Sequence, residues 1–352
     1  MSSTHILGRG SFGQVRREGN VAVKKFEKLS HLIQEVTVTT YFRDSPYIIK
    51  CEGYDLEKLE MRTQLHEISL RDALLKYELK REQKHAIFRD ILCGLVHIHS
   101  RNIVHADLKP SNVLVDFNPA RATICDLGLS STDRYSKVRQ TARAYRLPDT
   151  MINEDNGAYH DLYSLSIVGI ELFADIKLED QVSYHHLLKI LKEVSTSIND
   201  EKLMRAIRGM IKRSQGYTSA RSVLIELYNI DTCLPIPALP NIPNTLSKDE
   251  DKYLETQVQT LTTSMQIRRG RRCYYVLCER FCNRSYEPVR REEYQLYMVS
   301  MCIINSALFG QPGFTYKHAI SASHNRWGKR DINRAIYDII GKYDLINFMM
   351  LR

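Results

Sequence analysis

Long apolar runs are absent from this sequence. No stretch of about 18 or more apolar residues occurs, so no membrane-spanning helix is expected. A glycine-rich run begins at residue 8, which leaves no room for a signal peptide. The eight cysteines lack the spacing of a disulfide framework, which favours reduced thiols. These absences exclude membrane and disulfide-rich secreted classes and predict an intracellular protein of the cytoplasm, the nucleus or both.

Patterns for zinc and for nucleic acid are weak. Cys273, Cys278 and Cys282 lie close together in sequence, but no second cysteine or histidine pair stands at zinc-ligand spacing. The net charge is +9, and the densest basic run spans 268–272. Such a run suits nucleic acid, a nuclear import receptor or an acidic protein, and equally a solvated helix start. Because few aromatic residues lie among the basic ones, nucleic-acid binding is not favoured.

What the chain does contain is most informative at residues 103–128, IVHADLKPSNVLVDFNPARATICDLG. Phosphoryl transfer needs positioned charge more than covalent chemistry. Asp107 is the candidate to orient an attacking hydroxyl, and Lys109 is the candidate to neutralise charge on the transferred group. Asp126 and Asn112 offer the oxygen ligands that Mg²⁺ prefers. Solvated loop polarity is the alternative for any one of them, but not for the ordered set.

This run resembles the catalytic and metal-binding loops of eukaryotic-type protein kinases, with HAD for HRD and DLG for DFG. Upstream, residues 8–15 resemble the family's glycine-rich loop and Val21-Ala-Val-Lys24 its lysine strand. The resemblance implies ATP and Mg²⁺ as cofactors. The nucleotide-binding residues that it predicts are Gly8, Gly10, Ser11, Phe12, Gly13, Val15, Ala22, Lys24 and Asn112.

The resemblance also assigns catalytic roles. Lys24 would reach the α and β phosphates and would be held by a helix glutamate. Glu35 is the match, and Glu27 is the alternative, although it lies too close to the strand. The predicted catalytic set is Asp107, Lys109, Lys24 and Glu35, with Asn112 and Asp126 as metal ligands. The form D-L-K-P-S-N resembles Ser/Thr kinases rather than tyrosine kinases, and dual specificity stays open.

Less specific features surround this site. Thr63 would guard the adenine pocket, with residues 64–66 as the hinge, and Cys125 would be a small apolar wall. Asp161 would tie the backbone of the catalytic loop, and a role as helix N-cap is compatible with this. Ala106 replaces an arginine that grips a phosphorylated activation loop, so we predict activity that does not depend on loop phosphorylation.

Further departures from the family affect structure and substrate binding. Leu127 replaces a phenylalanine, which is a modest change of packing. Asp149 and Tyr217 stand where the family has a structural ion pair, which is either absent here or rebuilt from Arg213 or Arg221. Ala142 stands where the family has a threonine at the substrate site. None of these changes removes a metal ligand or the presumed base.

The sequence predicts an α+β fold. The bilobal kinase domain would span 1–232, with a small β-rich lobe at about 1–66 and a helical lobe at about 67–232. A linker at 233–247 follows, with four prolines in nine residues. An all-α module would occupy 248–352, with helices at 272–282, 294–308 and 331–341 and one more at 253–266.

The C-terminal module resembles a cyclin box over about 80 residues. Leu277-Cys-Glu-Arg-Phe-Cys282 is similar to the L-x-D-R-F-L of cyclins, and Gln295-Leu296 falls where cyclins place Q-L. The tail at 327–344 resembles the fifth cyclin helix. The Lys–Glu pair with which cyclins meet a kinase is not evident, since Ala307 and Arg334 stand there. A cyclin-like fold and a generic helical bundle both stay open.

Two functions follow. One is a Ser/Thr protein kinase acting on protein substrates, whose C-terminal module binds the kinase lobe in cis, on the helix carrying Glu35, or binds another protein. The other is a catalytically weak nucleotide-binding scaffold that works through its basic module. The retained Lys24, Asp107, Asn112 and Asp126 favour the kinase. The small lobe and tight motif spacing resemble kinases of large DNA viruses, which would place the protein in a host cell.

Overall fold

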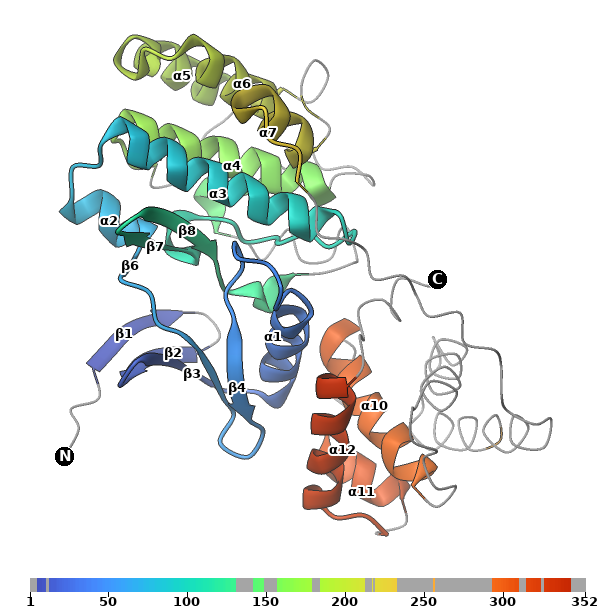
Figure 1. Cartoon of the computed structure of the whole chain (residues 1–352). Coiled ribbons are helices and arrows are strands. Elements are labelled where there is room, and N and C mark those ends of the chain that lie inside the picture. Colours follow the sequence, from blue (N-terminus) through green and yellow to red (C-terminus); the bar gives the residue numbers. More distant parts are fainter. Residues whose placement is uncertain are drawn as a thin grey trace.

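The computed structural model describes residues 5–10, 13–130, 142–148, 157–178, 184–212, 217, 219–232, 256, 293–309, 315–323 and 326–342. Figure 1 shows a small lobe built on an antiparallel sheet, a larger helical region, and a C-terminal group of helices beside the small lobe. The predicted α+β architecture is confirmed at this level. The proline-rich linker and the predicted helices at 272–282 and 253–266 lie outside the described residues, apart from the helical residue 256.

The small lobe is a five-stranded sheet with one helix. The sheet order is β1-β2-β3-β5-β4, and each neighbouring pair is antiparallel. The elements are β1 (His5–Gly10), β2 (Gly13–Glu18), β3 (Val21–Phe26), α1 (Leu29–Tyr41), β4 (Cys51–Asp55) and β5 (Glu60–Gln64). In β3, Val23 and Phe26 are buried, while Lys24 lies between them and pairs in register with Val15 of β2. This register places the lysine on the central strand.

The helical region packs on a second, three-stranded sheet of order β6-β7-β8, on the side facing the small lobe (Figure 1). Its elements are β6 (Ile68–Ser69), α2 (Leu70–Lys76), α3 (Arg81–His99), η1 (Pro110–Asn112), β7 (Val113–Phe117), β8 (Ala120–Ile124), η2 (Leu127–Leu129), η4 (Arg143–Tyr145), α4 (Gly157–Ala174), α5 (Tyr184–Ile198), α6 (Glu201–Ile211) and α7 (Ala220–Tyr228). A Cβ on Gly94 of α3 would lie 2.7 Å from Ile124, so α3 packs very closely on β8. This close packing fixes the strand that leads into Asp126.

Side-chain caps begin two helices of the helical region. Asp200 caps α6 by accepting a hydrogen bond of 2.9 Å from the backbone N–H of Leu203. Ser219 caps α7 in the same way, at 3.2 Å from the N–H of Ser222. Asn229 ends α7 in the left-handed conformation, with φ 54°. These caps satisfy the backbone groups that the ends of a helix leave without partners.

The C-terminal helices are α10 (Tyr294–Phe309), α11 (Tyr316–Ala322) and α12 (Lys329–Lys342). The predicted helices at 294–308 and 331–341 correspond to α10 and α12, whereas α11 was not predicted. Both α10 and α12 contact α1, and their apolar side chains form one core with the small lobe (Figure 1). From the small lobe, this core takes Phe26, Leu32, Ile33, Val36, Leu56 and Met61. No helix in the described ranges is long and apolar enough to cross a membrane.

Candidate active site

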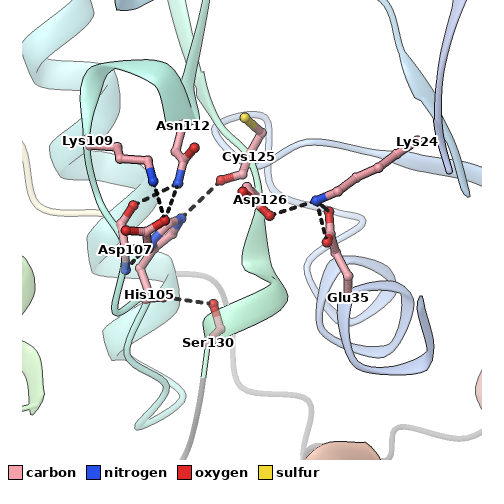
Figure 2. A network of polar contacts seen from close by, with 9 residues as sticks. All are labelled: Lys24, Glu35, His105, Asp107, Lys109, Asn112, Cys125, Asp126 and Ser130. Carbon is pink, nitrogen blue, oxygen red and sulfur yellow. Dashed lines mark hydrogen bonds and ion pairs between the residues drawn. The ribbon is translucent and has the colours of Figure 1, made fainter. Parts of the chain in front are cut away.

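Three charged side chains meet between the small lobe and β8. The Nζ atom of Lys24 lies 2.7 Å from Oε2 of Glu35 and 2.7 Å from Oδ1 of Asp126. Figure 2 shows the lysine reaching from β3 to both carboxylates, with Glu35 on α1 and Asp126 after β8. Lys24 contacts Glu35 and not the alternative Glu27, as the sequence predicts. Asp126 adopts a left-handed backbone conformation, with φ 62°.

The electrostatics of this cluster follow from burial and pairing. Burial opposes the charge on Lys24, but Glu35 and Asp126 outweigh it and raise the pKa of Lys24. Burial likewise opposes ionisation of Asp126, but Lys24 outweighs it and holds the pKa of Asp126 below its usual range. Burial raises the pKa of Glu35 to about 7, and attraction to Lys24 limits that rise. The cluster therefore keeps a cation and an ionised carboxylate together in a largely buried place.

The catalytic-loop residues gather around Asp107. Lys109 Nζ lies 2.7 Å from Oδ2 of Asp107, and Asn112 Nδ2 donates to that oxygen at 3.0 Å. Asn112 also donates to the backbone oxygen of Asp107 at 2.8 Å. Its amide nitrogen therefore faces Asp107, and its carbonyl oxygen is turned away, as Figure 2 shows. The geometry thus brings the predicted base, lysine and asparagine into one cluster.

A buried aspartate on α4 holds the backbone of this loop. Oδ2 of Asp161 accepts hydrogen bonds from the N–H of His105 at 2.8 Å and from Nε2 of His99 at 2.9 Å, and its Oδ1 accepts one from the N–H of Ala106 at 2.9 Å. Ala106 has φ 66°, a left-handed conformation that a residue with a side chain seldom adopts. The N-cap interpretation of Asp161 is wrong, because α4 begins at Gly157 and Asp161 lies in its second turn.

A further set of bonds joins the two clusters. Nε2 of His105 donates to the backbone oxygen of Cys125 at 3.1 Å, one residue before Asp126 (Figure 2). Ser130, just beyond η2, donates its hydroxyl to the His105 oxygen at 3.4 Å, and Gln34 of α1 donates to the Ser130 oxygen at 3.0 Å. The helix that carries Glu35 is therefore tied to the segment that carries Asp126.

The predicted glycine-rich loop corresponds to β1, β2 and the residues between them. Gly10 pairs with Gly13 in the register, and the turn with Ser11 and Phe12 between them lies outside the described residues. Gly13 has φ 154°, and a Cβ there would lie 1.8 Å from the backbone oxygen of Lys25. Only glycine fits that position. The roles of Gly8, Gly10, Ser11, Phe12, Gly13, Val15 and Ala22 toward a nucleotide remain predictions.

The oxygen atoms at the site suit Mg²⁺. Lys24 takes Oδ1 of Asp126, so Oδ2 stays available, and Asn112 turns its carbonyl oxygen away from Asp107. Hard cations bind such oxygens together with phosphate and water. In the described part of the chain, no group of three His, Cys, Asp or Glu side chains could hold a metal ion by itself. The cysteines considered for zinc lie outside the described residues.

One buried network was not predicted from the sequence. Glu171 of α4 is fully buried; its Oε2 lies 3.0 Å from NH2 of Arg71 in α2 and accepts a hydrogen bond of 2.7 Å from the Tyr145 hydroxyl. Arg71 also donates to that hydroxyl. No sequence signal links residues 100 positions apart.

The predicted ion pair between Asp149 and Arg213 or Arg221 is not tested. Arg221 pairs with Asp231 at 2.6 Å, and Asp149 and Arg213 lie outside the described residues.

Comparison with known proteins gives a consistent result. The model of the protein kinase domain matches residues 1–227. Mitogen-activated protein kinase 5 of Oryza sativa subsp. indica is 33% identical over 147 residues, which are 41% of this chain and 38% of that protein. Mitogen-activated protein kinase 13 of Arabidopsis thaliana is 28% identical over 230 residues, 56% of this chain and 61% of that protein. The chain thus spans less than two thirds of these relatives, and α10–α12 lie beyond the matched domain.

Proposed function

Since this chain belongs to the protein kinase domain family, we propose that it is a Ser/Thr protein kinase, which transfers the γ-phosphate of ATP to protein hydroxyl groups. The observation that carries the proposal is the pair of linked clusters, Asp107 with Lys109 and Asn112, and Asp126 with Lys24 and Glu35. The names of the relatives support it, because both are mitogen-activated protein kinases. The D-L-K-P-S-N form favours serine and threonine as acceptors.

Each residue would contribute positioned charge. Asp107 would accept a hydrogen bond from the substrate hydroxyl and take its proton as the new P–O bond forms. Lys109, already in contact with Asp107, would stabilise negative charge on the transferred group. Lys24, oriented by Glu35, would bind phosphate oxygens. Asp126 and Asn112 would hold Mg²⁺, which neutralises phosphate charge when bound.

Metal removal provides the direct test of this function. The wild-type chain is incubated with γ-labelled ATP, Mg²⁺ and matched peptides whose single acceptor is Ser, Thr or Tyr. We expect transfer to Ser and Thr. A chelator should abolish this transfer and added Mg²⁺ should restore it, because the ion that Asp126 and Asn112 would hold neutralises the phosphate charge. Transfer to Tyr alone would contradict the Ser/Thr assignment. Loss of all transfer, with ATP still bound, would favour the nucleotide-binding scaffold.

We further propose that α10–α12 activate the kinase in cis by holding α1. Leu32, Ile33 and Val36 of α1 are fully buried in the core shared with α10 and α12, on either side of Glu35 in sequence. The hydroxyl of Tyr337 in α12 accepts a hydrogen bond of 2.9 Å from the Leu56 N–H, and its ring stacks on Tyr54 at 4.9 Å. These contacts would favour the position in which Glu35 meets Lys24.

The α12 contact can be tested with a point variant in the full chain. Ile336 is fully buried in the shared core, so Ile336→Asp places a charge in an apolar environment and should detach the helices. We expect kcat/KM to fall at least about tenfold, within the range of typical coupling between sites. Trp327, the single tryptophan, packs against the same core, so a red shift of its fluorescence reports detachment.

The matched control is Arg334→Ala, at an exposed position of the same helix. It should change neither kcat/KM nor the tryptophan spectrum. Full activity of Ile336→Asp with a red-shifted spectrum would remove the activating role. The cyclin-like fold itself stays a prediction, because the run at 277–282 lies outside the described residues. The same holds for nucleic-acid binding by the basic run at 268–272.

A further inference from the structure

A basic cavity lies beside the catalytic loop. Its volume is about 630 Å³. The described residues that line it are Arg71, Lys109, Ser111, Ala142, Arg143, Ala144, Tyr145, Lys177 and Leu178. Four of these nine side chains are cationic, and none of the nine is acidic. The proposed mechanism uses only Lys109, so the other three cations have no role in it.

The charges around this cavity are not fully balanced by the carboxylates next to it. Arg71 lies 3.0 Å from the buried Glu171, and Lys109 lies 2.7 Å from Asp107. Arg143 and Lys177 are exposed. Among the described residues, Arg143 lies within ion-pair distance of no acidic side chain. Arg143 therefore gives the cavity a positive charge that no carboxylate of the described residues balances.

The segment that carries Arg143 is fixed relative to the presumed base. The hydroxyl of Tyr145 donates to Glu171 at 2.7 Å, and Ser164 of α4 donates to the Tyr145 backbone oxygen at 2.7 Å. At the other end, the Ala142 N–H donates to Oδ1 of Asp107 at 3.3 Å. The basic residues are therefore presented on a braced segment that touches the residue proposed to orient the acceptor hydroxyl.

We propose that this cavity binds an anionic side chain of the protein substrate, acidic or phosphorylated, within a few residues of the acceptor hydroxyl. Lys109 both lines the cavity and contacts Asp107, so a bound side chain lies close to the site of transfer. Guanidinium groups suit carboxylate and phosphate oxygens because they donate paired hydrogen bonds to them. This inference rests on the proposed kinase function, and it specifies the substrate class.

The test compares peptides with one acceptor serine and one variable flanking position, which carries Glu, phosphoserine, Gln or Lys. Separate peptide sets place this variable position at different distances on either side of the acceptor. We expect one position at which kcat/KM for Glu or phosphoserine exceeds that for Gln at least about tenfold. In the double variant Arg143→Gln/Lys177→Gln this ratio should approach one. In Arg143→Glu/Lys177→Glu the Lys peptide should become the preferred one. Arg71 is left unchanged because it pairs with buried Glu171.

The control is Lys189→Gln on α5, whose side chain is 76% exposed and which should keep the wild-type ratio. A second readout is fluorescence anisotropy of the labelled phosphoserine and Gln peptides without ATP. If the phosphoserine peptide binds more strongly than the Gln peptide, and Arg143→Gln/Lys177→Gln abolishes the difference, the result supports anion binding in the cavity. If no transfer occurs in the same protein, the kinase proposal alone fails. Equal binding and equal transfer for all four peptides would overturn the proposal. Peptide binding that appears only after the protein itself is treated with phosphatase would also overturn it. The normal occupant of the cavity would then be a phosphorylated residue of this chain and not the substrate.

Discussion

Replacing Asp126 with alanine is expected to lower kcat by about 10³-fold or more, the largest effect of any single change considered. The variant loses the carboxylate that would hold Mg²⁺, and it also loses one of the two counter-charges of Lys24, at 2.7 Å. Lys24 keeps Glu35, so the small lobe should remain folded. The measurement is kcat and the KM for ATP over a range of Mg²⁺ concentrations, together with the melting temperature.

Asp231→Ala is the matched control for this prediction. Asp231 makes an exposed ion pair with Arg221, and such pairs contribute little. Its kcat should be close to that of the wild type. If Asp126→Ala retained more than a tenth of the wild-type kcat, Asp126 would not be the metal ligand, and the transfer would need another centre or a contaminating kinase.

Asp161→Asn should cause the second large loss, in stability as well as activity. The buried carboxylate accepts hydrogen bonds from two backbone N–H groups and from His99. The single oxygen of asparagine can replace Oδ2, which accepts two of these bonds, but the amide nitrogen then faces the Ala106 N–H and cannot accept its hydrogen bond. Breaking such a buried charged network costs about 3 kcal/mol, which corresponds to a decrease in melting temperature of about 6–12 °C. Because Ala106 would lose the bond that holds its left-handed conformation, we also expect kcat to fall by about 10²-fold.

The pH dependence of the same variant checks the cause. Burial opposes the charge on Asp161, but its neighbours His160 and His99 outweigh it and hold the pKa of Asp161 below its usual range. A carboxyl group with a lowered pKa in the folded state stabilises the fold fully above its unfolded pKa and loses that effect as the pH falls. The gap in unfolding free energy between wild type and Asp161→Asn should thus be constant from pH 6 to pH 8 and should shrink below about pH 4. Asp44→Asn, at an exposed position, should show no comparable gap.

The sequence was sufficient for the local parts of the site. Asp107, Lys109 and Asn112 lie within a few residues of one another, so one loop brings them together. Lys24 and Glu35, which meet at 2.7 Å, were paired through the resemblance to protein kinases, in which a helix glutamate holds the strand lysine. The structural reason for glycine at position 13 was not predicted, because it depends on the backbone oxygen of Lys25 in the neighbouring strand.

Long-range pairings could not be predicted in this way. Arg71 and Glu171 come from helices 100 positions apart, and neither residue stands in a motif. The N-cap interpretation of Asp161 was wrong because the start of α4 is not visible as a composition change. The packing of α10 and α12 on α1 was suggested only by a resemblance to cyclins, which stays a prediction, as does the resemblance to viral kinases. Apolar periodicity shows that a helix has a partner but does not identify it.

The shared core of α1, α10 and α12 has a consequence for synthesis on the ribosome. The small lobe is translated first, yet α10 begins only at Tyr294, about 250 residues after α1 ends. At typical elongation rates, this delay is on the order of tens of seconds. During that time Leu32, Ile33 and Val36 lack the apolar surface that finally covers them. A nascent chain of this protein should therefore need a chaperone at α1 until α10, α11 and α12 emerge.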